Sequence, residues 1–130
     1  MSDEKALKVL VVDDEIHIVQ VVAIKLRNNG FEVFTCENGA QALQLASKEK
    51  PDIVITDVQM PVMTGLELVQ NLRSKPDTAG IPVIMLTARD FAIEDRQKKE
   101  LNISACVSKP FSPRELLQSV EEVLKESVAV

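Results

Sequence analysis

The chain has 130 residues, a formal net charge of −5 and two cysteines, which suits one globular domain over residues 1–130, with a core over about residues 7–126, that needs no disulfide framework. It contains no tryptophan or tyrosine and no basic cluster, so direct nucleic-acid binding by this chain is not expected. No apolar stretch reaches the roughly 18 residues of a membrane span, and the charged segment Met1–Lys5 lacks the apolar core of a signal peptide. These features favour a cytoplasmic protein.

The first half of the chain alternates apolar runs of strand length with segments of helical period, a pattern typical of an α/β parallel sheet. Strands are predicted over Lys8–Val12 and Glu32–Cys36. The helix between them should end at Gly30, which suits a left-handed C-terminus. The next helix should begin after Asn38, a favourable N-cap, and end before Pro51.

The second half continues the same alternation. Strands are predicted over Asp52–Thr56, Pro82–Leu86 and Ser104–Ser108. Thr64 and Glu67 have the spacing of a capping box, which predicts the start of a helix.

The fourth and fifth helices differ in the strength of their signals. A helix over about Asp90–Leu101 is expected to be loosely held, because Glu94–Glu100 contains no apolar residue. By contrast, Ser112, Pro113 and Glu115 supply the N-cap, the first-turn proline and the capping glutamate of a well-defined last helix. Together the elements make five βα units, and right-handed crossovers predict a doubly wound parallel sheet.

Polar residues follow four of the predicted strands at their carboxyl ends. The first strand runs into Asp13-Asp14-Glu15, the third into Asp57, the fourth into Thr87 and the fifth into Lys109. Because ligands of open parallel sheets bind beyond the carboxyl ends of the strands, we expect these side chains to converge. Three nearby carboxylates repel one another unless a cation is present, and oxygen ligands suit Mg²⁺, with Mn²⁺ tolerated. The set therefore predicts a site for a divalent cation and a phosphoryl group, with Asp57 as nucleophile.

Four stretches, in this order, match a known family: Val11–Glu15 (VVDDE), Thr56–Gly65 (TDVQMPVMTG), Leu86–Ala88 (LTA) and Ser108–Phe111 (SKPF). Through them the chain resembles the receiver domain of bacterial two-component response regulators, of the chemotaxis-receiver type, over nearly its whole length. The resemblance implies a flavodoxin-like (βα)₅ fold with strand order 2-1-3-4-5. Whether the receiver is stand-alone or excised from a longer regulator stays open.

The resemblance also implies the ligands of the metal. Asp14, Asp57 and the backbone carbonyl of Gln59 would bind Mg²⁺ directly, and Asp13 would act through a water molecule.

The chemistry implied by the resemblance is formation of an aspartyl phosphate on Asp57. Lys109 would offset charge on the phosphoryl oxygens, and the hydroxyl of Thr87 would donate a hydrogen bond to one of them. The peptide bond between Lys109 and Pro110 would be cis, as in the family.

The partners implied are a histidine kinase or phosphotransfer protein as donor and a downstream protein target or effector domain. Phosphorylation would switch the surface around the fourth helix, fifth strand and fifth helix, and a phosphorylation-dependent homodimer is left open. The chain would not be a turnover enzyme, although it catalyses phosphorylation and dephosphorylation of Asp57 itself.

Two features depart from, or vary within, the family pattern. Cys106 stands where the family usually carries an aromatic residue, so the aromatic half of the common switch should be missing. We expect Cys106 and Cys36 to be reduced, partly buried and about 19 Å apart on opposite edge strands. Gln59 and Arg89 occupy positions that influence hydrolysis in the family, and as long polar side chains they should shield the phosphorus from water.

Other functions fit the residues less well. An aspartate-nucleophile phosphatase usually has a second acid where this chain has Gln59. A flavin or nucleotide module would not place three acids, Asp13 to Glu15, in its first loop. A degenerate receiver would have lost functional positions that are intact here. Gly65 is expected to serve a bend or helix start rather than a phosphate loop, and His17 is expected to be exposed.

Overall fold

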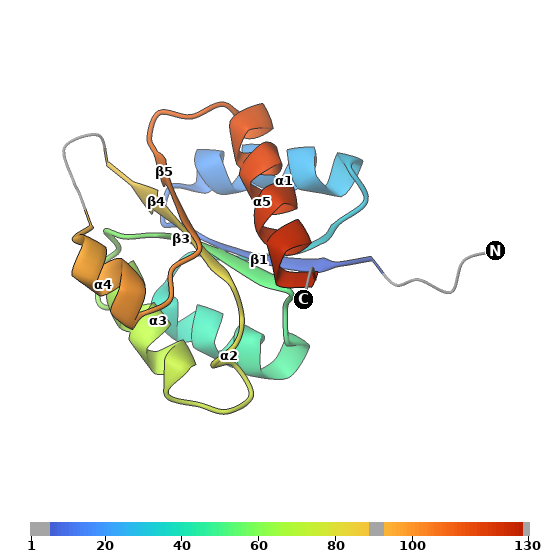
Figure 1. Cartoon of the computed structure of the whole chain (residues 1–130). Coiled ribbons are helices and arrows are strands. Elements are labelled where there is room, and N and C mark those ends of the chain that lie inside the picture. Colours follow the sequence, from blue (N-terminus) through green and yellow to red (C-terminus); the bar gives the residue numbers. More distant parts are fainter. Residues whose placement is uncertain (1–5, 89–92, 129–130) are drawn as a thin grey trace.

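The computed structural model describes residues 6–88 and 93–128. Five parallel strands form one sheet in the order β2-β1-β3-β4-β5, which confirms the predicted flavodoxin-like topology (Figure 1). The strands are β1 (Lys8–Val12), β2 (Glu32–Cys36), β3 (Ile53–Asp57), β4 (Val83–Thr87) and β5 (Ala105–Ser108).

Strands β3 and β4 lie one residue later than predicted. Asp57 still pairs with Leu86 across the sheet, and Thr87 still pairs with Ser108. The ladder therefore includes the two polar residues themselves, which the apolar pattern placed just beyond the strands. As a result their backbones are fixed by sheet hydrogen bonds.

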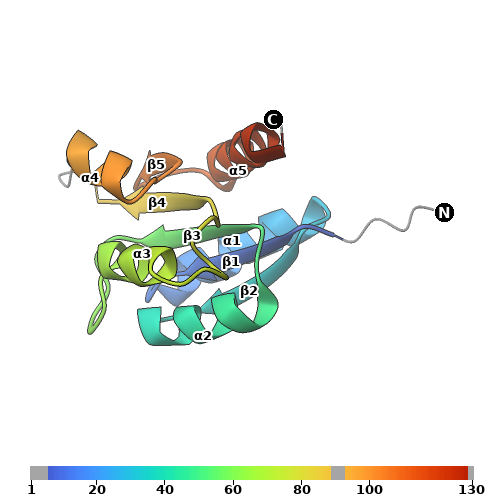
Figure 2. The same ribbon diagram turned by 60° about the horizontal axis from the view of Figure 1, so that its bottom comes forward.

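Helices cover both faces of the sheet (Figures 1 and 2). They are α1 (Ile16–Asn28), α2 (Gly39–Glu49), α3 (Gly65–Arg73), α4 (Asp95–Glu100) and α5 (Pro113–Val128). Side chains of β1 alternate between two cores, as strand geometry requires: Val9 and Val11 pack with α1 and α5, whereas Leu10 and Val12 pack with α2 and α3. In the described part of the chain, none of these helices has the length and apolar character of a membrane span.

The predicted helix starts are confirmed by their capping hydrogen bonds. Thr64 Oγ1 accepts from the N–H of Glu67 at 3.1 Å, and the carboxylate of Glu67 accepts from the N–H of Thr64 at 2.9 Å. Ser112 and Glu115 make the same reciprocal pair, with both distances 3.1 Å. Asn38 Oδ1 accepts from a backbone N–H of the first turn of α2 at 2.9 Å. These starts were readable from sequence because capping is local.

Helix α4 is shorter than predicted. It begins at Asp95 rather than about Asp90, and residues 90–92 of the predicted helix lie outside the described residues. None of its six residues is buried, because the segment offers no apolar face. The buried contacts that hold it lie beyond its ends. Ile93 is buried, and Leu101 packs against the core between the sheet and helices α2 and α3.

Arg73 connects the end of α3 to the loops on either side of β4 and α4. Its guanidinium donates to the backbone carbonyls of Ala79 and Ile81, at 2.8 and 2.7 Å, and of Leu101 and Asn102, at 2.8 and 3.2 Å. A guanidinium offers five donors in a rigid fork, so one side chain can satisfy four carbonyls. The sequence pattern gave no sign of this contact. It fixes the C-terminal end of α4, while the helix itself has no buried side chain.

Gly65, the first residue of α3, is required by a close approach of two backbones. A Cβ atom there would overlap the carbonyl oxygen of Asp57 and lie 3.0 Å from Val58 Cα. The N–H of Gly65 donates to the carbonyl of Val58 at 2.8 Å. The expectation that Gly65 serves a helix start is therefore confirmed, and the glycine lets α3 begin directly against the end of β3.

Replacing Arg73 with alanine should lower the free energy of unfolding by about 3 kcal/mol, because several partly buried carbonyls lose their donors at once. Urea denaturation of Arg73→Ala, beside the exposed-site control Arg114→Ala, measures the effect. Equal stability losses in the two variants would contradict the role assigned to Arg73.

Gly65→Ala should destabilise the protein by about 2 kcal/mol, because the new methyl group meets backbone rather than a mobile side chain. Gly80→Ala is the matched control, since a Cβ at Gly80 meets nothing within 4 Å, and its effect should be close to zero or slightly stabilising. Thermal unfolding of both variants tests this; a Gly65→Ala variant as stable as the control would mean that the backbones can separate freely.

Candidate functional site

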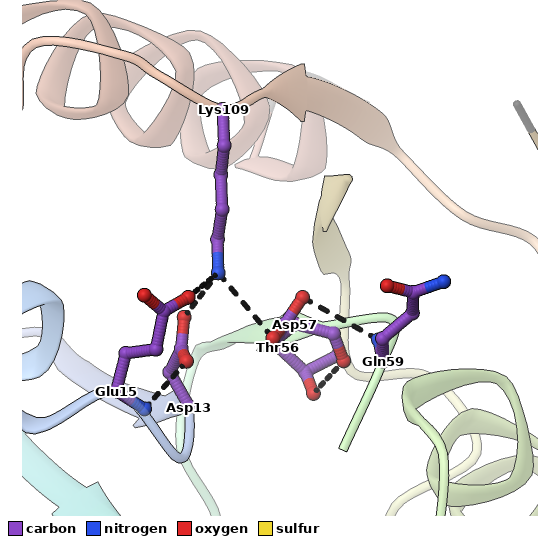
Figure 3. Close-up of polar contacts among 6 residues, drawn as sticks. All are labelled: Asp13, Glu15, Thr56, Asp57, Gln59 and Lys109. Atoms are coloured by element: carbon purple, nitrogen blue, oxygen red, sulfur yellow. Dashed lines mark hydrogen bonds and ion pairs between the residues drawn. The ribbon is translucent and has the colours of Figure 1, made fainter. Parts of the chain in front are cut away.

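Three carboxylates meet at the carboxyl edge of the sheet. Asp13 and Asp14 follow β1, Asp57 ends β3, and one oxygen from each lies within 4.8 Å of the others. Asp13 is fully buried and Asp57 is nearly so, whereas Asp14 is exposed. Asp13 Oδ1 accepts from the N–H of Glu15 at 2.9 Å, and Asp57 Oδ1 accepts from the N–H of Gln59 at 3.4 Å (Figure 3). The strand ends thus bring together Asp13 and Asp57, which are 44 positions apart in sequence.

Lys109 extends from the end of β5 into this cluster (Figure 3). Its Nζ atom lies 3.0 Å from Asp13 Oδ2, 3.3 Å from Asp57 Oδ2 and 2.8 Å from Glu15 Oε1. Its backbone N–H donates to the carbonyl of Thr87 at 2.7 Å, which ties the ends of β4 and β5 together. Thr87 itself is buried. The contact with Glu15 was not predicted, although an acid beside the Asp pair was visible in the sequence.

Burial dominates the electrostatics of the acids. It raises the pKa of Asp13 and that of Asp57, because a charged carboxylate loses solvation; Lys109 opposes the shift in both, and the charge of Asp14 adds to the rise at Asp57. For Lys109, burial alone disfavours the ammonium. Its contacts with Glu15 and Asp13 and the charge of Asp57 outweigh burial, so the pKa of Lys109 is raised. Lys109 therefore stays charged at neutral pH.

The carboxylate oxygens of this cluster are suitable ligands for a small, hard divalent cation. Asp13 Oδ2 lies 3.0 Å from Lys109 Nζ but without hydrogen-bond geometry, so within the described residues this buried oxygen accepts no hydrogen bond. Asp14 and Asp57 add further carboxylate oxygens within reach. An oxygen-only set of this kind is the ligand type that Mg²⁺ and Mn²⁺ use in proteins.

Gln59 lies at the rim of the site. Val58 and Met60 on either side of it are buried, and this anchors the loop and leaves the side chain of Gln59 exposed two residues beyond Asp57. Arg89, the second residue predicted to shield the phosphorus, lies outside the described residues.

The cysteines are both free, on opposite edge strands, as predicted. Cys36 is buried, and the loss of solvation raises the pKa of its thiol to about 12. The prediction for Cys106 is wrong in one respect, because its side chain is exposed rather than partly buried. Cys106 and Ser108 lie on the outer side of edge strand β5, and alternation leaves that side of the strand exposed.

Two smaller predictions are confirmed. The peptide bond between Lys109 and Pro110 is cis. His17 is exposed on α1, where it lines a cavity of about 550 Å³ between that helix and the loop after β5.

Comparison with known proteins gives consistent matches. Residues 9–121 match the response regulator receiver domain. The chain is 38% identical over 120 residues to the alkaline phosphatase synthesis transcriptional regulatory protein PhoP of Bacillus subtilis (strain 168), covering 92% of this chain and 49% of that protein. The chain therefore spans about half the length of this curated relative.

Solved structures agree in fold. The chemotaxis response regulator CheY4 of Vibrio cholerae is 38% identical, with a TM-score of 0.84 and coverage of 92% of this chain and 99% of that one. A response regulator from Desulfuromonas acetoxidans is 30% identical, with a TM-score of 0.81 and coverage of 92% and 98%. The match over residues 9–121 and the 38% identity to a response regulator of known structure show that this chain belongs to the response regulator receiver domain family of two-component signal transduction.

Proposed function

We propose that Asp57 accepts a phosphoryl group from a phosphohistidine of a histidine kinase or phosphotransfer protein. A carboxylate oxygen of Asp57 attacks phosphorus, the P–N bond breaks, and its electron pair returns to the imidazole of the donor. The observation that carries this proposal is the position of Asp57. It is a nearly buried carboxylate 3.3 Å from the ammonium of Lys109 and beside two further acids.

Lys109 and Thr87 supply the protein's own donors to the phosphoryl oxygens in this proposal. The ammonium of Lys109 already lies beside Asp57 Oδ2, so it can neutralise charge that arrives there. The hydroxyl of Thr87 is proposed to donate a hydrogen bond to a second oxygen. The hydrogen bond from Lys109 N–H to the Thr87 carbonyl supports joint positioning of the two residues.

Mg²⁺ is the proposed cofactor, and Mn²⁺ should be tolerated. Asp14, Asp57 and the backbone carbonyl of Gln59 would hold the ion directly, with Asp13 acting through a water molecule. When bound, the ion neutralises the clustered acids and the charge on the phosphoryl oxygens.

Phosphorylation is proposed to alter the surface formed by α4, β5 and α5. Support comes from α4, which has no buried side chain, so that small energies can displace it. Cys106 on β5 is exposed and is too small to act as the aromatic reporter usual in the family. Coupling would then run through Thr87 and α4.

The wider assignment follows from the same proposal. Residues 1–130 would form one receiver domain, cytoplasmic, with a core over about residues 7–126 and no direct contact with nucleic acid. Its output would be a downstream protein target or an effector domain, and a phosphorylation-dependent homodimer remains open to test. Self-modification of Asp57, rather than turnover of a substrate, would be its only catalysis.

Incubation with acetyl phosphate and Mg²⁺ should add one phosphoryl group per chain, because Asp57 is the proposed acceptor. Intact-mass spectrometry should show this adduct in the wild type and in the exposed-site control Asp77→Asn. The adduct should be lost in Asp57→Asn and when Mg²⁺ is chelated. Labelling that survives Asp57→Asn would place the acceptor elsewhere, and release of many equivalents of phosphate per minute would favour a phosphatase.

Gln59→Ala should speed loss of the phosphoryl group about two- to fivefold, because a long polar side chain at the rim obstructs attack by water. Arg89→Ala is expected to act in the same direction. The decay of the phosphorylated protein is followed after removal of the donor, with the exposed Gln70→Ala as control. Unchanged decay in both variants would count against shielding.

A further inference from the structure

We propose that Glu15 is a positioning residue for phosphoryl transfer: it holds the ammonium of Lys109 in the unmodified protein and releases it to the phosphoryl group on Asp57. This inference rests on the proposed function of Asp57. It assigns to Glu15 the role of setting how readily an anionic phosphodonor engages the site.

The contacts of Lys109 are unequal. Its Nζ atom donates a hydrogen bond to Glu15 Oε1 at 2.8 Å, the shortest of the three carboxylate contacts that it makes within the described residues. The contact with Asp13 at 3.0 Å lacks hydrogen-bond geometry, and the contact with Asp57 is longer, at 3.3 Å. In the unmodified protein Lys109 is therefore bound most closely by Glu15, which is not the residue that it must serve during transfer.

Glu15 differs from the other two acids in exposure. Its side chain is 59% exposed, whereas Asp13 is fully buried and Asp57 nearly so. An exposed carboxylate that loses a partner regains water, but a buried one does not. When phosphoryl oxygens arrive beside Lys109, the lysine can thus leave Glu15 at a smaller cost in solvation free energy than it could leave Asp13 or Asp57.

Among the described residues, the side chain of Glu15 makes no hydrogen bond or ion pair except the one with Lys109. Glu15 precedes α1, and its carbonyl accepts from the N–H groups of Ile18 and Val19, but its side chain makes no capping hydrogen bond. Its own N–H is held by Asp13 Oδ1. Serine, threonine, aspartate or asparagine would cap the helix better. The backbone is therefore fixed independently, and the side chain is left to contact Lys109 (Figure 3).

Glu15 is also distinct from the acids of the candidate metal site. The carboxylate oxygens that lie within 4.8 Å of one another come from Asp13, Asp14 and Asp57. Glu15 instead contacts Lys109, and its exposed carboxylate adds negative charge beside the site that an anionic donor has to approach. Its negative charge opposes that approach and its hydrogen bond competes for the ammonium, so both effects act in the same direction.

The test compares autophosphorylation by acetyl phosphate at fixed, saturating Mg²⁺ in the wild type, Glu15→Gln and Glu37→Gln. Glu37 is an exposed glutamate that lines the same hollow as Asp14, so its variant removes the same charge beside the site. Glu15→Gln should lower the half-saturating donor concentration about two- to fivefold, the scale of one exposed ion pair. The maximal rate should change less, and the melting temperature should stay at the wild-type value.

A double-mutant cycle then asks whether Glu15 acts through Lys109. In a Lys109→Met background, Glu15→Gln should have no more effect than Glu37→Gln. If labelling of that background is too slow to time, the same cycle is read from the beryllofluoride concentration that half-saturates the NMR shifts around Asp57.

The possible results separate the role proposed for Glu15 from the proposed function of Asp57. A larger effect of Glu15→Gln than of Glu37→Gln that disappears with Lys109 supports the proposal. Equal effects of the two glutamate variants, or an effect that persists without Lys109, overturn it while leaving Asp57 as the acceptor. If wild-type Asp57 is not labelled at all, the proposed function itself fails, and the role of Glu15 fails with it.

Discussion

Two buried carboxylates beside each other, Asp13 and Asp57, are the constraint around which the rest of the structure is arranged. Burial raises the pKa of each, so the protein pays a solvation penalty to keep both ionised. The ammonium of Lys109 offsets part of that penalty, and a divalent cation on the exposed side, next to Asp14, would offset more. Among the described residues the acids of this site outnumber its one lysine, so under the proposed function the site would attract a cation and, through it, an anionic phosphoryl group.

The fold keeps this arrangement rigid at the sheet and adaptable beyond it. Asp57 and Thr87 belong to the sheet ladder, and Gly65 allows α3 to begin against the backbone of Asp57. Farther out, Arg73 fixes the end of α4, whose own side chains are unburied. Under the proposed function, the backbone of the site would keep its geometry, and α4, none of whose own side chains is buried, would be the part that responds to a change in charge at Asp57.

Lys109 has competing partners, and that competition gives the site a defined resting state. Glu15 is the exposed partner and Asp13 the buried one. Exchange of the exposed partner for a phosphoryl oxygen changes solvation less than exchange of the buried one. Under the proposed function, the same lysine would thus stabilise the acid cluster first in the unmodified protein and then in the phosphorylated one.

The sequence alone determined the order of the elements, the helix caps and the convergence of Asp13, Asp14, Asp57, Thr87 and Lys109 at one edge, because periodicity and capping are local and parallel strands share a direction. It misplaced the start of α4 and the burial of Cys106, since both depend on what covers a segment rather than on the segment itself. The contacts of Arg73, the close approach at Gly65 and the hydrogen bond from Lys109 to Glu15, 94 positions away in the chain, were decided only by the tertiary structure. Such contacts join segments remote in sequence, and no local pattern encodes which atoms will meet when the strands and helices pack.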